Sequence, residues 1–149
     1  MALFSRPIQV RWSDIDANRH LRHSAYYDYG ASLRMMVLQE NGLTTEHMEQ
    51  YQIGPVLFRE EAIFKREIVL EDILTMDVEL TKATRDYGRW SMRHHLYKNE
   101  ITLAAIINID AAWIDLSIRK LARPNDFVKD IFKNFPVSSD FTWIEPSTK

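Results

Sequence analysis

The stretch SAYYDYGASLRMMVLQEN, residues 24–41, predicts one long helix around which the other elements can be arranged. Ser24 is suited to the N-cap, because its hydroxyl can accept a hydrogen bond from a first-turn amide. Gly42 follows the stretch and tolerates the positive φ with which many helices end. The apolar side chains recur at helical spacing, at Ala25, Tyr26, Tyr29, Leu33, Met36 and Val37. We therefore expect a helix with one buried face.

On the C-terminal side of this helix the pattern changes to a period of two, which is typical of β-strands. After a polar connection, long strands are predicted at residues 56–70, 74–81, 90–96 and 103–113. The last of these is continuously apolar and suits a central position in a sheet. Shorter elements are predicted as a strand at residues 8–12 and a helix at 124–135, with no clear pattern beyond 138. One helix followed by consecutive strands predicts an α+β fold, with an antiparallel sheet wrapped around the helix.

Length and composition limit the classes of function. A chain of 149 residues fits one domain, 1–149, with a tail at about 136–149. Because 19 basic residues stand against 21 acidic ones, no basic excess favours a nucleic-acid partner. The absence of cysteine excludes a disulfide framework, a thiolate metal site and a cysteine nucleophile. With no signal-peptide pattern and no long apolar run, we expect a cytoplasmic protein without a membrane span.

On the N-terminal side of the helix lies a polar loop, residues 13–23, that carries the candidate chemistry. Its five candidate groups are Asp14, Asp16, Asn18, His20 and His23. We expect Asp14 to be structural, either capping a turn or holding Arg11. Asp16 has a structural alternative as a turn-stabilising residue, and the two histidines could serve only to hydrogen-bond the loop. The loop shows no recognised metal-ligand spacing, so we expect no metal site.

The run Arg11-Trp-Ser-Asp-Ile-Asp-Ala17, followed by Asn18, His20 and Tyr26, resembles the signature of the hotdog-fold acyl-CoA thioesterases related to 4-hydroxybenzoyl-CoA thioesterase. The predicted element order over residues 6–130 also matches that fold. The resemblance implies hydrolysis of an acyl-CoA or acyl-carrier thioester, without a metal or redox cofactor and with coenzyme A only as part of the substrate. It also implies a homo-oligomer, a dimer or a tetramer, with a continuous sheet and active sites between subunits.

The same resemblance implies roles for residues in and after the loop. Asp16 corresponds to the catalytic carboxylate, which can attack a thioester carbonyl or activate water. Amides around His23 and Ser24 would stabilise the carbonyl oxygen as it gains charge. His23 is similar to a helper histidine of some bacterial members, while Asn18 and His20 resemble the Asn-x-His of plant-type acyl-carrier-protein thioesterases. Substrate contacts are expected from Ser24, Arg19 and Tyr26.

Some features leave alternatives open. Many relatives have Gly where this chain has Arg19, and this departure bears on the class of substrate. Arg59 and Glu61 resemble a family pair with a structural or dimer-facing role. Four further basic residues are either contacts for coenzyme A phosphates or solvated charges at the sheet edge: Arg85, Arg89, Arg119 and Lys120. The rival functions are a non-hydrolytic acyl-CoA-binding protein and another hotdog enzyme such as a dehydratase.

Overall fold

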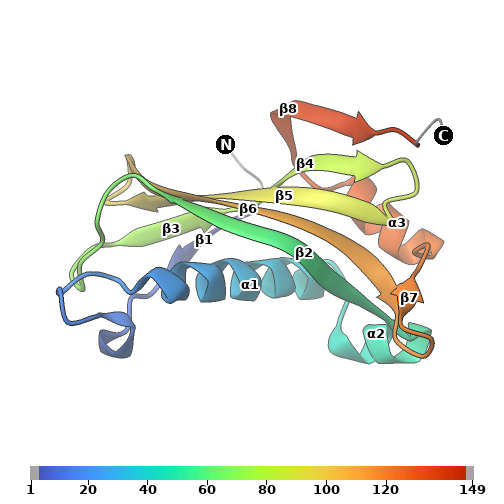
Figure 1. Ribbon diagram of the computed structural model, residues 1–149, viewed down its shortest axis with the longest axis horizontal. Helices are drawn as coiled ribbons and strands as arrows, with labels where there is room; N and C mark the ends of the chain where they lie inside the picture. The colour runs from blue at the N-terminus through green and yellow to red at the C-terminus, as the bar shows by residue number, and fades with distance from the viewer. Residues whose placement is uncertain (1–3, 147–149) are drawn as a thin grey trace.

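The computed structural model describes residues 4–146 and has one long helix lying against a curved β-sheet (Figure 1). The helices are α1 (His23–Glu40), α2 (Thr45–Tyr51) and α3 (Asp126–Lys133), and a 3₁₀ turn covers Trp12–Asp14. The strands are β1 (Ser5–Ile8), β2 (Ile53–Phe64), β3 (Leu74–Asp77), β4 (Glu79–Thr84), β5 (Arg89–Lys98), β6 (Thr102–Asp115), β7 (Lys120–Leu121) and β8 (Val137–Ile144). This arrangement is the α+β hotdog fold that the sequence predicts.

The sheet is built around the antiparallel partners β5 and β6. On one side β6 pairs with β2, which forms an edge of the sheet. On the other side β5 pairs with β3 and then with β4. β1 lies beyond β3, while β8 lies parallel to β4. In Figure 1 the loop before α1 lies at one end of the sheet, and α2 and α3 lie at the other.

The core lies between α1 and the sheet. The α1 side chains that face it are almost inaccessible, with Ala25, Leu33 and Val37 all 0% exposed. The apolar positions of the predicted strand at residues 74–81 are also buried, at Leu74, Met76, Val78 and Leu80. Burying each large aliphatic side chain contributes roughly 1.5–3 kcal/mol. The helical and period-two patterns are therefore confirmed at these positions, but the prediction was wrong for Met36, which is 41% exposed.

The start of α1 differs from the prediction. Arg22, not Ser24, occupies the N-cap position, and no side chain caps the helix there. The Ser24 hydroxyl instead accepts a hydrogen bond from the Arg22 guanidinium. Because that hydroxyl is occupied, the first-turn amides of α1 receive no side-chain partner from it.

Two strand boundaries also differ, and two elements were not predicted. The first strand is β1 at Ser5–Ile8, earlier than residues 8–12, and β2 ends at Phe64 instead of reaching residue 70. The polar connection after α1 contains α2, whose N-cap Thr44 accepts a hydrogen bond from the amide of His47. The C-terminal segment contains β8, which pairs with β4. Its polar and apolar residues show no simple alternation, so this strand could not be predicted from its pattern.

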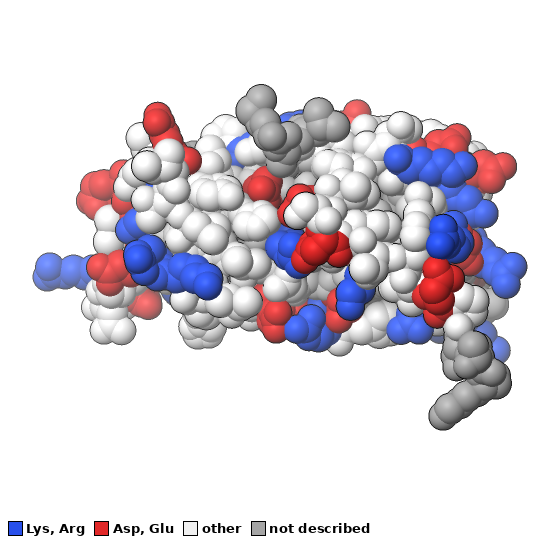
Figure 2. Space-filling view, turned by 90° about the horizontal axis from the view of Figure 1, so that it is seen from above, with Lys and Arg blue, Asp and Glu red and all other residues white. Residues whose placement is uncertain are grey.

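The surface carries charges of both signs. Figure 2 shows the side of the molecule opposite α1, where acidic and basic side chains are interspersed without a large region of one sign. This distribution agrees with the formal net charge of −2. Within residues 4–146, no helix combines the length and apolarity needed to cross a bilayer.

Candidate active site

A pocket of about 360 Å³ lies at the N-terminal end of α1. It is formed by the loop before α1, the first turn of that helix, and the segment at and after the end of β2. Its lining residues are Asp16, His20, Leu21, His23, Tyr26, Phe64, Lys65, Arg66 and Glu67. The pocket therefore gathers four of the residues that the sequence singled out and four charged or aromatic residues that it did not.

Asp14 anchors the loop beneath the pocket. Its side chain is 1% exposed and accepts a hydrogen bond from the Tyr29 hydroxyl at 2.8 Å. The guanidinium groups of Arg11 and Arg22 lie at 3.2 and 3.3 Å from the same carboxylate. Burial opposes the charge, but the hydrogen bonds from Arg11 and Tyr29 outweigh it and hold the pKa of Asp14 below its ordinary value. The expectation of a structural Asp14 that holds Arg11 agrees with these contacts.

Asp16 lies at the surface of the loop and borders the pocket. Its Oδ1 accepts hydrogen bonds from the amides of Asn18 at 2.9 Å and His20 at 3.2 Å. The backbone of Asp16 also donates to the His20 carbonyl at 2.9 Å, which closes a tight turn. No hydrogen bond from the described residues reaches Oδ2. Asp16 therefore stabilises a turn through one carboxylate oxygen and keeps the other available.

The two histidines have different partners. His20 Nε2 lies 2.8 Å from Glu67 Oε2, so this imidazole is held against an acid on the far wall. His23 is the first residue of α1 and is exposed at the pocket. Among the hydrogen bonds formed within residues 4–146, none involves the His23 ring. The geometry leaves His23 freer than His20 to meet a ligand.

The N-terminus of α1 adds unpaired donors at the same place. The first amides of a helix have no intrahelical acceptor, and here no side chain caps them. The amide of Ala25 bonds to the Arg22 carbonyl at 3.0 Å, whereas those of His23 and Ser24 have no partner in the described part of the chain. The positive end of the helix dipole therefore has two unpaired amides, of which that of His23 belongs to a residue that lines the pocket.

Tyr26 and Phe64 form the aromatic wall of the pocket. Tyr26 is 3% exposed, and its ring meets that of Phe64 edge-on, with centroids 4.9 Å apart. Burial, and then the nearby charge of Asp16, raise the pKa of the Tyr26 hydroxyl. The hydroxyl is therefore protonated at neutral pH and lies within the electrostatic field of Asp16.

Three predicted site residues do not line this pocket. Asn18 contributes its backbone amide to the Asp16 turn, and Ser24 is bonded to Arg22. Arg19 is exposed and has a φ of 67°, the left-handed conformation that favours glycine. This φ gives a physical reason for the Gly that many relatives carry at this position.

The segment that follows β2 contributes the residues that the sequence analysis missed: Phe64, Lys65, Arg66 and Glu67. Here the regular pairing of β2 with β6 ends. The amides of Lys65 and Arg66 both donate hydrogen bonds to one carbonyl of β6, that of Ala104. The sequence placed these residues inside a strand, so only their cluster of charges signalled an exposed position.

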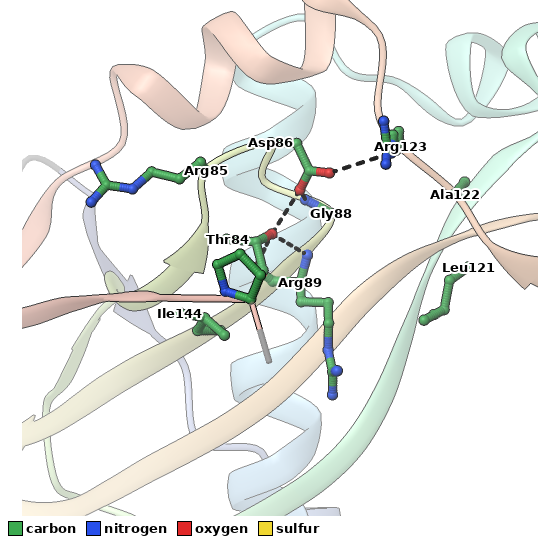
Figure 3. Close-up of a pocket in the computed structure, with 10 residues that line it drawn as sticks. Thr84, Arg85, Asp86, Gly88, Arg89, Leu121, Ala122, Arg123 and Ile144 are labelled. Carbon is green, nitrogen blue, oxygen red and sulfur yellow. Dashed lines mark hydrogen bonds and ion pairs between the residues drawn. The ribbon is translucent and has the colours of Figure 1, made fainter. Parts of the chain in front are cut away.

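A larger pocket, of about 530 Å³, lies at the opposite end of the sheet and is shown in Figure 3. It includes Arg85, Arg89 and Arg123, but their guanidinium groups point in different directions in Figure 3. Arg85 pairs with Glu145 at 3.0 Å, and Arg123 lies 3.8 Å from Asp86. The arginines therefore do not converge on one anion, and this pocket carries no comparable set of reactive groups. In the part of the chain that the structure describes, no three acidic or histidine side chains are grouped as metal ligands.

Comparisons with known proteins agree with this geometry. A family model described as the thioesterase-like superfamily matches residues 10–132, which include the loop, α1 and the whole pocket. None of the curated proteins shows a significant sequence match.

Solved structures show the same fold at low sequence identity. A hypothetical protein from Staphylococcus aureus in complex with CoA has a TM-score of 0.79 and 21% identity, covering 95% of this chain and 89% of that chain. A 1,4-dihydroxy-2-naphthoyl-CoA thioesterase from Synechocystis has a TM-score of 0.79 and 16% identity, covering 88% and 96%. A gentisyl-coenzyme A thioesterase has a TM-score of 0.75 and 17% identity, covering 86% and 98%. The chain therefore belongs to the thioesterase-like superfamily, and it is a thioester hydrolase with the hotdog fold.

Proposed function

We propose that the protein hydrolyses an acyl-CoA thioester and that Asp16 is the carboxylate that starts the reaction. The observation that carries the proposal is that Asp16 and His23, the first residue of the uncapped helix α1, line the same pocket. An ionised carboxylate can attack the thioester carbonyl or remove a proton from an attacking water. The turn amides hold one oxygen of Asp16 in place, so the second oxygen has a defined direction of approach.

The amides of His23 and Ser24 would stabilise the negative charge that develops on the carbonyl oxygen. Donors fixed at a helix N-terminus need no reorganisation when that charge appears, which is why such groups accelerate acyl transfer. His23 is the better candidate for a helper that orients water or protonates a leaving group, since Glu67 already holds His20. Imidazole suits either task because its protonation changes near neutral pH.

The substrate carrier is proposed to be coenzyme A. Two structural neighbours are named for activity on CoA thioesters, and a third was solved in complex with CoA. In this chain Lys65 and Arg66 are exposed at the pocket, where they could form charge-assisted hydrogen bonds with phosphate groups. These residues are better placed for that role than Arg85 or Arg89, which lie at the other end of the sheet.

A homodimer is proposed to complete the pocket. β2 pairs with β6 alone among the strands of residues 4–146, so its other edge has no strand partner. Phe64 ends that strand, lines the pocket and is 53% exposed. A second copy paired along β2 would cover the exposed apolar side chains of this edge and lie directly beside the pocket.

The activity can be tested by release of free thiol. Because the chain has no cysteine, a thiol reagent reports only coenzyme A released from a panel of acyl-CoA substrates. We expect turnover of at least one of these acyl-CoA substrates. Parallel assays with acyl-carrier-protein substrates show which of the two carriers the protein uses. Saturable acyl-CoA binding without thiol release would contradict hydrolysis and favour a binding protein.

A further inference from the structure

Tyr26 carries a buried hydroxyl group that makes no hydrogen bond within the described part of the protein. It is the fourth residue of α1, and its side chain is only 3% exposed. None of the hydrogen bonds formed within residues 4–146 involves this hydroxyl. Buried polar side-chain groups almost always have a partner, so an exception needs a physical explanation. A hydroxyl without a partner in the fold is available to a ligand.

The hydroxyl has access to the candidate active site. Tyr26 lines the pocket at the N-terminal end of α1, together with Asp16 and His23. In the described part of the chain, the polar side-chain atoms that are sealed from solvent and have no partner are Trp90 Nε1, Trp113 Nε1 and Ser138 Oγ. The Tyr26 hydroxyl has no partner either, but it is not one of these sealed atoms. It therefore remains accessible, and the pocket is where an acceptor can reach it.

The helix directs this hydroxyl toward its own N-terminus. The Cα–Cβ bonds of an α-helix tilt toward the N-terminal end, so a long side chain lies over the preceding turn. His23 is three residues before Tyr26 and therefore lies on the same face of α1. The His23 amide has no acceptor in the described part of the chain, and no side chain caps the helix there. The phenol and an unpaired amide therefore belong to the same wall of the pocket.

Packing fixes the ring that carries the hydroxyl. The Tyr26 ring belongs to the core cluster and meets the Phe64 ring edge-on, with centroids 4.9 Å apart. Lys65 and Arg66 also line the pocket, but both are exposed. Ordering a long exposed side chain costs conformational entropy, whereas a buried ring has already lost its freedom. The phenol is therefore a better positioned donor than either of these two cations.

The nearby carboxylate of Asp16 does not use this donor. Its Oδ1 accepts from the amides of Asn18 and His20, and no hydrogen bond from Tyr26 reaches its Oδ2. Burial, and then the charge of Asp16, raise the pKa of the phenol, so its proton is retained at neutral pH. The phenol is therefore a donor that gains an acceptor only when a ligand enters the pocket.

We infer that the Tyr26 hydroxyl donates a hydrogen bond to the thioester carbonyl oxygen and stabilises the charge that this oxygen gains during the reaction. This inference rests on the proposed acyl-CoA hydrolysis. A carbonyl oxygen has two lone pairs, so it can accept from the His23 amide and the phenol together. Tyrosine is among the side chains that stabilise such an oxygen in enzymes. The hydroxyl keeps its proton throughout, because it donates a hydrogen bond and transfers no atom.

The kinetic test is the change Tyr26→Phe, which removes the hydroxyl and keeps the ring that packs against Phe64. Because no hydrogen bond within the described chain is lost, the free energy of unfolding should not fall below that of wild type. On an acyl-CoA that the wild type hydrolyses, we expect kcat to fall by about 100-fold. KM should change little, since the donor acts on charge that develops only in the transition state.

The matched control is Tyr27→Phe. Tyr27 is on the same turn of α1 and is partly buried, but it does not line the pocket. This variant loses a phenol hydroxyl from the same helix and should keep the wild-type kcat. A comparison of the two variants therefore separates the position of the hydroxyl from the general effect of its removal.

The group that accepts from the phenol can be identified by difference infrared spectroscopy of a bound acyl-CoA that is isotopically labelled at the thioester carbonyl carbon. The measurement uses Asp16→Asn, in which hydrolysis should be slow. A hydrogen bond to the oxygen lowers the carbonyl stretching frequency. The band should therefore lie at higher frequency in Asp16→Asn with Tyr26→Phe, and it should be unchanged in Asp16→Asn with Tyr27→Phe.

Wild-type kcat in Tyr26→Phe would overturn the inference. A fall in kcat with an unchanged carbonyl band would also overturn it, because the hydroxyl would then act on another group such as Asp16. If Asp16→Asn is fully active, the proposed carboxylate fails, while kcat of Tyr26→Phe and the band of the bound acyl-CoA still decide the inference. If acyl-CoA binds without hydrolysis, the proposed function fails, and the band in wild type and in Tyr26→Phe decides the inference. Absence of both binding and hydrolysis would overturn both.

Discussion

Asp14 and Asp16 are two residues apart and have opposite environments. Asp14 is buried beneath the loop and satisfied by arginine and tyrosine donors, so it has no free oxygen facing the pocket. Asp16 is exposed at the pocket, with one oxygen fixed by backbone amides. The 3₁₀ turn at Trp12–Asp14 and the tight turn after it produce this separation. Asp14 therefore stabilises the loop, whereas Asp16 is the candidate for the chemistry.

Arg19 stores backbone strain in the same loop. A left-handed conformation costs a non-glycine residue about 1–2 kcal/mol. A glycine avoids this cost, but its greater conformational freedom in the unfolded state offsets about 0.5–1 kcal/mol of the gain in stability. Because the φ of Arg19 is 67°, we expect Arg19→Gly to raise the free energy of unfolding by about 0.5–1 kcal/mol. Urea unfolding measures this change.

A control for Arg19→Gly is provided by Asn99, which also has a positive φ, of 52°. Its side chain bonds to Asp72 at 2.9 Å and to the Ile73 amide at 3.2 Å, so Asn99→Gly loses contacts as well as strain. We expect no stabilisation there. A destabilised Arg19→Gly protein would show that the Arg19 side chain makes a contribution that its exposed position does not indicate.

At the level of helices and strands, the hydrogen bond from Arg34 to His94 ties α1 to β5 and makes the contact sensitive to pH. The pKa of His94 is lowered to about 3 in the folded protein, whereas an unfolded histidine titrates near pH 6.5. Between these values the unfolded chain binds a proton that the folded chain does not, so stability falls as the pH falls.

We therefore expect the free energy of unfolding to decrease on acidification from about pH 6 to 5, approaching 1.4 kcal/mol per pH unit for one proton. His94→Gln keeps a possible acceptor for Arg34 and should remove this part of the slope. Neighbouring His95 has a pKa raised by its hydrogen bond to Asp77, so its effect on the free energy of unfolding has the opposite sign to that of His94. Identical slopes in wild type and His94→Gln would contradict the neutral, buried His94.

The elements that could be predicted from the sequence are those in which the spacing of apolar residues shows which side chains are buried. α1 and the strands β3 to β6 have continuous helical or alternating apolar positions, and the structure places most of those positions in the core, with Met36 of α1 as an exception. β8 was missed because its parallel pairing with β4 is a tertiary contact that leaves little mark on its own sequence. The extension of β2 to residue 70 was wrong because Ile68 is buried by the loop, where its carbonyl accepts from the Leu21 amide, and not by a strand.

For the molecule as a whole, the sequence indicated the loop and the helix that form the candidate site but not its far wall. Asp16, His20, His23 and Tyr26 do meet in one pocket. Lys65, Arg66 and Glu67 come from a segment that follows β2, far from the loop in the sequence, and only the packing of β2 beside α1 brings them there. A single sequence contains no signal for such a contact between distant segments.

The proposed dimer would form along the same edge of the sheet. Leu57 and Ile63 of β2 are both 42% exposed, so changing them to Lys should leave the fold of one copy intact. We expect wild type to be a dimer and Leu57→Lys with Ile63→Lys to be a monomer with reduced kcat/KM. Light scattering after size-exclusion chromatography measures the mass. A monomeric wild type with full activity would contradict a site completed by a second copy.

The most direct test of the account is the rate of coenzyme A release by Asp16→Asn at saturating acyl-CoA. This change keeps the shape of the side chain and its acceptor for the Asn18 and His20 amides but removes the charge that attacks or activates water. We predict a fall in kcat of at least ~100-fold, in the range that positioned acid–base groups supply. Asp130→Asn, the same change at an exposed position of α3, should match wild type. Full activity of Asp16→Asn would contradict the central claim and place the reacting carboxylate elsewhere.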